Sequence, residues 1–129
     1  MPPASNNAAV RVLIADDHGL FAEALEAILT ADGRIAVLGH AHDGQQALEL
    51  AMRLRPDVVL MDISMPVLDG IEATRLITEL TPAPSVLMLT GSNSKYDVDR
   101  SREAGASGYI TKDRIAAELV EAILEVAHR

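Results

Sequence analysis

Short apolar segments alternate five times with helix-like segments, and this alternation constrains the fold more than any other feature of the chain. The apolar segments are nearly continuous, so both faces of each expected strand should be buried, as in a parallel sheet covered by helices. We therefore predict an α/β fold, a doubly wound five-stranded parallel sheet in a three-layer sandwich. The expected strands are residues 11–15, 35–41, 57–61, 85–89 and 107–111.

Apolar residues at helical spacing follow each expected strand. Pro56 should end the second helix, because the residue before a proline is pushed out of the helical region. Residues 1–9 contain two prolines and two asparagines, and we predict a disordered tail there, followed by a single domain over residues 10–129. The expected helices are residues 18–31, 43–54, a segment starting near 70, 94–104 and 114–128.

Charge and composition exclude several classes of protein. The chain has 19 acidic and 11 basic side chains and a net charge of −8, so it should repel nucleic-acid phosphates and make no direct nucleic-acid contact. It lacks cysteine, which excludes disulfides and thiolate metal sites. With neither a signal peptide nor an apolar run near the roughly 20 residues that span a bilayer, we expect a cytoplasmic protein without membrane contact.

Polar side chains follow four of the five expected strands. Asp16 and Asp17 follow the first, Asp62 the third, Thr90 the fourth and Lys112 the fifth. Open parallel sheets bind ligands outside the carboxyl ends of their strands. These side chains should therefore meet at one edge of the sheet.

The chemistry of this group points to a metal ion and a phosphoryl group. A lone aspartate before a helix is usually a helix cap, but three carboxylates at one edge repel one another unless a cation lies among them. Oxygen ligands alone favour Mg²⁺. His18 could approach the same edge, although we expect it to help start the first helix. An aspartate can accept a phosphoryl group as a nucleophile, with positive charge from Lys112 beside it.

Four segments together resemble the receiver domain of a two-component response regulator. They are residues 12–17, residues 57–66 with the Asp69-Gly70 pair, residues 86–90 and residues 105–112. The Asp16-Asp17-His18 start and the Lys112-Asp113 end resemble the NarL/LuxR-type subfamily, although many receivers have proline in place of Asp113. The resemblance covers nearly the whole chain and implies the flavodoxin/CheY-like strand order 2-1-3-4-5.

The resemblance also implies a role for each site residue. Asp62 would be the phosphoacceptor, and Mg²⁺ would be held by Asp16, Asp17, Asp62 and the backbone carbonyl of Ser64. The phosphoryl group would be contacted by Thr90, with Gly91 beside it leaving room, and by Lys112. Tyr109 would turn inward when Thr90 moves toward the phosphate, although a half-buried tyrosine that does not switch is an alternative.

The implied partners follow from the same family. A sensor histidine kinase would donate the phosphoryl group. An output domain or partner protein would read the surface formed by the fourth helix, fifth strand and fifth helix. The domain could also form a homodimer. Members of this subfamily usually regulate transcription through a separate DNA-binding domain. The domain itself is not expected to act as an enzyme beyond self-phosphorylation and autodephosphorylation.

Three other functions stay open. An aspartyl-nucleophile phosphatase would need a second acid two residues after Asp62, where this chain has Ser64. A flavin-binding domain would need a hydroxyl- and glycine-rich loop after the first strand, where Asp16 and Asp17 would repel phosphate. A degenerate receiver would bind a protein partner without being phosphorylated.

Overall fold

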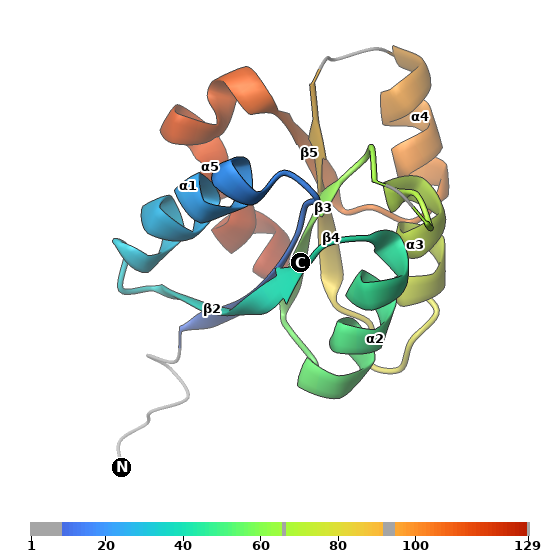
Figure 1. The fold of residues 1–129 in the computed structure, drawn as a ribbon, viewed down its shortest axis with the longest axis horizontal. Helices are drawn as coiled ribbons and strands as arrows, with labels where there is room; N and C mark the ends of the chain where they lie inside the picture. Colours follow the sequence, from blue (N-terminus) through green and yellow to red (C-terminus); the bar gives the residue numbers. More distant parts are fainter. Residues whose placement is uncertain (1–8, 66, 92–94, 129) are drawn as a thin grey trace.

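The computed structural model describes residues 9–65, 67–91 and 95–128. A parallel five-stranded sheet in the order β2-β1-β3-β4-β5 forms its centre (Figure 1). The strands are β1 Val10–Ala15, β2 Ile35–Ala41, β3 Val58–Asp62, β4 Ser85–Thr90 and β5 Gly108–Thr111. The helices are α1 Gly19–Thr30, α2 Gly44–Leu54, α3 Gly70–Ile77, α4 Lys95–Glu103 and α5 Ile115–Ala127, with a 3₁₀ turn η2 at Lys112–Arg114.

Alternate residues along the strands build two separate cores. One core packs strand side chains such as Ile14 and Leu60 against α1 and α5, and the other packs Leu13 and Met61 against α2 and α3. Figure 1 shows α1 and α5 on one face of the sheet and α2 and α3 on the other. Because both faces of the central strands are covered, all five residues of β3 are buried. This burial explains why its sequence is continuously apolar up to Asp62.

Local signals set the ends of the helices. Asp43 and Asp69 cap α2 and α3, because each side chain accepts a hydrogen bond from the backbone N–H three residues later. α2 ends at Leu54, and the next residue, Arg55, has a left-handed φ of 52°. The helix therefore ends just before Pro56, as the sequence predicted.

The predicted fold class and strand order are confirmed, with small differences at the element ends. Asp62 and Thr90 are the last residues of their strands, whereas β5 ends at Thr111 and Lys112 begins the 3₁₀ turn. The predicted tail lies outside the described residues, apart from Ala9. Within the described part of the chain, every helix is too short or too polar to cross a bilayer.

Thr111 and Thr74 are two buried threonines that differ in whether the hydroxyl group makes a hydrogen bond. Its Oγ1 is buried and has no hydrogen-bond partner among the described residues, whereas the Thr74 hydroxyl donates to the Gly70 carbonyl at 2.7 Å. An unpaired buried hydroxyl costs free energy that valine avoids. We expect Thr111→Val to raise the free energy of unfolding by about 1 kcal/mol and Thr74→Val to lower it by about 1 kcal/mol. Urea denaturation would measure the free energy of unfolding of both variants. Equal losses of stability in the two variants would contradict the prediction.

Candidate functional site

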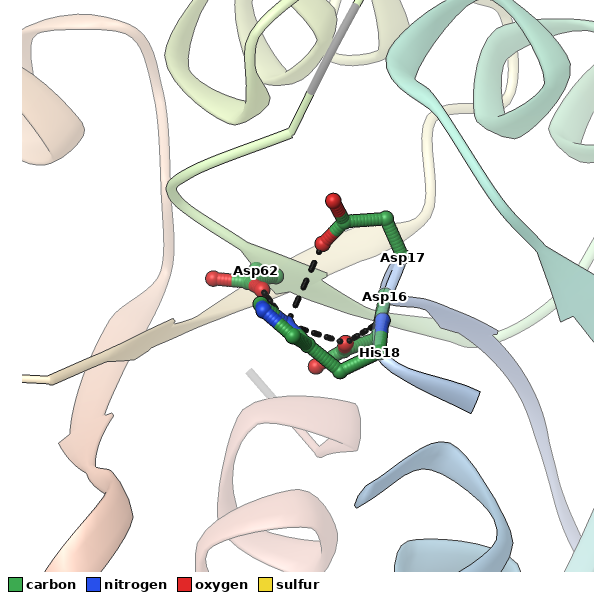
Figure 2. A group of neighbouring side chains, drawn as sticks. All are labelled: Asp16, Asp17, His18 and Asp62. Carbon is green, nitrogen blue, oxygen red and sulfur yellow. Dashed lines mark hydrogen bonds and ion pairs between the residues drawn. The ribbon is translucent and has the colours of Figure 1, made fainter. Parts of the chain in front are cut away.

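The loop after β1 and the last residue of β3 bring four side chains together at the carboxyl edge of the sheet. They are Asp16, Asp17, His18 and Asp62, and one potential ligand atom from each lies within 4.8 Å of all the others (Figure 2). The β1–β3 pairing places Ala15 beside Met61, which brings the two strand ends level. The convergence expected for the three aspartates is therefore present.

The two buried carboxylates of this group do not cap a helix. Asp16 and Asp62 are each only 1% exposed. Asp16 Oδ1 accepts a hydrogen bond from the His18 N–H at 2.7 Å, and Asp62 Oδ1 accepts one from the Ser64 N–H at 3.2 Å. Asp16 Oδ2 is buried without a hydrogen-bond partner in the described part of the chain. A buried carboxylate oxygen without a hydrogen bond is stabilised by a cation close to it.

Lys112 supplies positive charge beside the buried carboxylates. Its Nζ lies 3.4 Å from Asp62 Oδ2 and 4.0 Å from Asp16 Oδ2. The same ammonium lies 4.6 Å from the centre of the Phe21 ring of α1. A cation over an aromatic face is attracted to it, so Phe21 helps to hold Lys112 over the site. The sequence pattern did not predict this contact of Phe21 with Lys112.

His18 also belongs to the site, which corrects the expected role of its side chain. The residue occupies the N-cap position of α1, but its side chain makes no capping hydrogen bond. Instead, His18 Nδ1 lies 3.3 Å from Asp16 Oδ1, 3.2 Å from Asp17 Oδ1 and 3.7 Å from Asp62 Oδ2 (Figure 2). The side chain is 62% exposed, so it faces the group from the solvent side.

The Asp62 carboxylate is held in an environment that disfavours its charge. Burial raises the pKa of Asp62 above its usual value, and the nearby charge of Asp16 raises this pKa further. The hydrogen bond from the Ser64 N–H and the charge of Lys112 act in the opposite direction. The raising effects exceed the lowering ones, so the charged form of Asp62 is disfavoured even with Lys112 beside it.

The remaining predicted residues lie along β4 and β5. Thr90 is buried and pairs with Thr111 in the parallel register. Tyr109 is 42% exposed, beside a cavity of about 340 Å³ between α4 and β5 that Val98 and Ser101 help to line. Among the described residues, no atom would lie within 4 Å of a Cβ added to Gly91, so those residues do not require glycine at this position.

Gly70 has a steric role that the sequence pattern did not indicate, although the residue was part of the motif. A Cβ at Gly70 would lie 2.1 Å from the backbone oxygen of Asp62 and 2.9 Å from Ile63 Cα. The Gly70 N–H also donates to the Ile63 carbonyl at 3.2 Å. The start of α3 therefore packs directly against the backbone of Asp62 and Ile63, with no room for a side chain at Gly70.

Comparison with known families identifies the family to which the chain belongs. The response regulator receiver domain matches residues 12–124 of the chain. The chain belongs to the receiver domain family. Receiver domains are signalling modules of two-component systems, and the predicted family is thereby confirmed.

Two transcriptional regulatory proteins with similar sequences agree with this assignment. The transcriptional regulatory protein LnrK of Bacillus subtilis is 41% identical over 91% of this chain and 53% of its own length. LiaR of the same organism is 42% identical over 88% of this chain and 54% of its own length. The receiver domain therefore spans about half the length of these regulators.

Solved structures show the same fold. The signal receiver domain of NarL from Mycobacterium tuberculosis is 35% identical, with a TM-score of 0.88 over 94% of this chain and 98% of that chain. The response regulator domain of Thermotoga maritima CheB is 33% identical, with the same TM-score and coverage. CheY from Borrelia burgdorferi, solved in the CheX-CheY-BeF₃-Mg²⁺ complex, is 26% identical with a TM-score of 0.86 over 95% of this chain and 92% of that chain.

Proposed function

We propose that this receiver accepts a phosphoryl group on Asp62 in a Mg²⁺-dependent reaction and changes conformation in response. The observation that carries the proposal is the position of Asp62 Oδ2, which faces both Lys112 Nζ at 3.4 Å and the acidic group formed with Asp16 and Asp17. A nucleophilic oxygen, a fixed positive charge and a set of oxygen ligands are the parts that phosphoryl transfer to a carboxylate requires.

The residues present fit Mg²⁺. The ion would be held by carboxylate oxygens of Asp16, Asp17 and Asp62 and by the backbone carbonyl of Ser64, an all-oxygen set of the kind that suits a hard cation. Asp16 Oδ2 is buried without a hydrogen-bond partner among the described residues, and burial raises the pKa of Asp62, so a cation bound between these carboxylates would stabilise their charged forms. Bound Mg²⁺ would neutralise charge on the carboxylates and on the incoming phosphoryl oxygens. The Borrelia burgdorferi CheY, a relative of the same fold, was solved in a complex that contains BeF₃ and Mg²⁺, which supports the choice of ion.

The transfer step follows from the position of the side chains. An oxygen of the Asp62 carboxylate attacks phosphorus, a new O–P bond forms, and the bond from phosphorus to the donor breaks, with its electron pair leaving on the donor atom. For a phosphohistidine donor, that atom is an imidazole nitrogen. Lys112 stabilises negative charge on the phosphoryl oxygens as the group moves, and Thr90 would donate its hydroxyl to one of them.

The conformational response would pass from Thr90 to Tyr109. Movement of Thr90 toward the phosphoryl group would open space on the α4 side of the sheet, and the cavity beside the partly exposed Tyr109 would receive its ring. New charge shifts such an equilibrium only through contacts that differ between the two states. An output domain, a partner protein or a second copy of the chain would read the altered face of α4, β5 and α5.

We propose the phosphoryl donor, the cellular compartment and the output from the similarity to known response regulators. A sensor histidine kinase would be the donor, and the cytoplasm would be the compartment. LnrK and LiaR are transcriptional regulatory proteins, so regulation of transcription is the output that we propose for the protein in which this receiver acts. Residues 10–129 would form the receiver unit.

Mass spectrometry after incubation with a small phosphoryl donor and Mg²⁺ would test the proposal. We expect the wild type to gain one phosphoryl group and Asp62→Asn to gain none, because the nucleophilic oxygen is lost. Asp57→Asn is the matched control, since Asp57 precedes β3 at the opposite edge of the sheet and accepts a hydrogen bond from the Arg11 N–H. Equal labelling of wild type and Asp62→Asn would disprove the assignment. Repeated turnover of a phosphomonoester would instead favour the phosphatase alternative.

A further inference from the structure

His18 adds a ring nitrogen to a site whose other potential ligand atoms, in the described four-residue group, are carboxylate oxygens. Its Nδ1 lies 3.2 Å, 3.3 Å and 3.7 Å from one oxygen each of Asp17, Asp16 and Asp62. Two atoms bound to the same four-coordinate Zn²⁺, at bond lengths of roughly 2.0–2.1 Å, lie about 3.4 Å apart. The spacing between the imidazole nitrogen and the three oxygens therefore matches that between ligands of one small metal ion.

We propose that His18 Nδ1 is a metal ligand of this site, and that it gives the site a four-coordinate mode in which Zn²⁺ or Co²⁺ binds more tightly than Mg²⁺. Imidazole nitrogen suits these ions, whereas Mg²⁺ prefers oxygen and keeps several waters. Asp16 Oδ2 is an independent sign of a metal site, because this buried oxygen has no hydrogen-bond partner among the described residues and the ammonium of Lys112 comes only to 4.0 Å, so a metal ion would be a closer positive partner. Asp17 is 30% exposed and His18 is 62% exposed, so both side chains can adjust as an ion enters from solvent.

The consequence for the receiver rests on the proposed phosphorylation of Asp62. In the four-coordinate mode, Asp62 Oδ2 is bound to the metal together with His18 Nδ1, so the oxygen that faces Lys112 is no longer available for attack. A site occupied by Zn²⁺ or Co²⁺ in this way competes with the Mg²⁺-bound form that accepts a phosphoryl group. Through His18, Zn²⁺ and Co²⁺ would therefore oppose phosphorylation of Asp62, whereas Mg²⁺ would support it.

Direct binding of Co²⁺ to the metal-free protein would test the role of His18. Four-coordinate Co²⁺ absorbs visible light far more strongly than six-coordinate Co²⁺, and calorimetry gives the affinities for Co²⁺, Zn²⁺ and Mg²⁺. Loss of a residue that only supports a ligand weakens metal binding by roughly 10–100-fold, so loss of a ligand should cost at least about tenfold. We expect His18→Ala to weaken Co²⁺ and Zn²⁺ binding by that factor, to abolish the strong absorption, and to leave Mg²⁺ binding nearly unchanged.

His42→Ala is the matched control, because it removes another exposed histidine that is not part of the four-residue group. This variant should bind all three ions like the wild type. NMR of the His18 ring in the unmodified protein gives a second measurement, since Zn²⁺ bound at Nδ1 shifts that nitrogen resonance and the His42 ring should not respond.

Two results would overturn the proposal. One is a His18→Ala protein that binds Co²⁺ as tightly as the wild type. The other is an equal loss of Mg²⁺ and Co²⁺ affinity in that variant, which would mean that His18 shapes the loop without binding metal. Failure of phosphorylation is distinguishable, because a wild type that binds Co²⁺ through His18 but gains no phosphoryl group on Asp62 would contradict the proposed function alone.

Discussion

Gly70→Ala is expected to destabilise the domain by about 3 kcal/mol or more, because overpacking against backbone atoms cannot be relieved by a side-chain rotation. The added Cβ would lie 2.1 Å from the Asp62 carbonyl oxygen, well inside any permitted contact. Either α3 or the end of β3 must move. Movement of β3 would displace the Asp62 side chain from Lys112, so phosphorylation of the folded fraction should also slow.

Gly19→Ala is the control for this prediction. Gly19 also begins a helix, α1, but a Cβ there would meet no atom of the described part of the chain within 4 Å. Alanine favours a helix over glycine, so this variant should be as stable as the wild type or more stable by up to about 1 kcal/mol. Urea unfolding followed by circular dichroism would compare the two. A loss below about 1 kcal/mol for Gly70→Ala would show that the α3–β3 contact relaxes easily.

The close contact at Gly70 illustrates which parts of the fold could be predicted from the sequence. Continuous apolar runs alternating with helical periodicity were enough to predict a doubly wound parallel sheet, because burial on both faces leaves little choice of architecture. The positions of Asp16, Asp62 and Thr90 followed from one further rule, that the carboxyl ends of parallel strands share an edge. Gly70 was part of the family motif. Glycine is required there because the start of α3 lies close to the backbone of Asp62, and this tertiary contact cannot be read from the local sequence pattern.

The side-chain contacts of the site were less predictable than the positions of its residues, because they too depend on neighbours that are distant in the sequence. The contact of Phe21 with Lys112 joins α1 to the turn after β5, and both residues had simpler explanations, as a core residue and as part of the family motif. His18 stands where a helix begins, so its position favoured a capping role over the observed turn of its ring toward Asp16 and Asp17. Rotamers of this kind depend on neighbouring charges, which become apparent only after the strands have been aligned.

Lys112→Met is expected to have the second large effect, on both stability and chemistry. Methionine keeps most of the volume of the side chain but removes the ammonium that lies 3.4 Å from Asp62 Oδ2. In metal-free protein at neutral pH the buried carboxylates would then lack this counter-charge, and we expect a loss of about 2 kcal/mol, less than for a fully buried pair because Lys112 is 27% exposed. The rate of phosphorylation should fall by about 10²-fold, as for loss of one charge-stabilising donor.

The stability loss should depend on pH, because the pKa of Asp62 is already raised by burial and by Asp16, and Lys112 is one of the groups that lower it. Removing Lys112 raises this pKa further. A carboxyl with a raised pKa binds its proton more tightly in the folded state, so its contribution to stability is complete below the unfolded pKa of about 3.9 and is lost as pH rises through the folded pKa. The difference between wild type and Lys112→Met should therefore be small near pH 4 and grow toward pH 7.

Urea unfolding of both proteins across this pH range, in the presence of a chelator, would measure that difference. Lys95→Met is the control, because Lys95 is 89% exposed and pairs with Asp99 within α4, where an exposed ion pair contributes little at any pH. Mg²⁺ at pH 7 should return part of the stability lost in Lys112→Met, since a cation among the carboxylates replaces some of the missing charge. A deficit that is the same at pH 4 and pH 7 would mean that Lys112 stabilises the domain through its packing on Phe21 and not through the charge of Asp62.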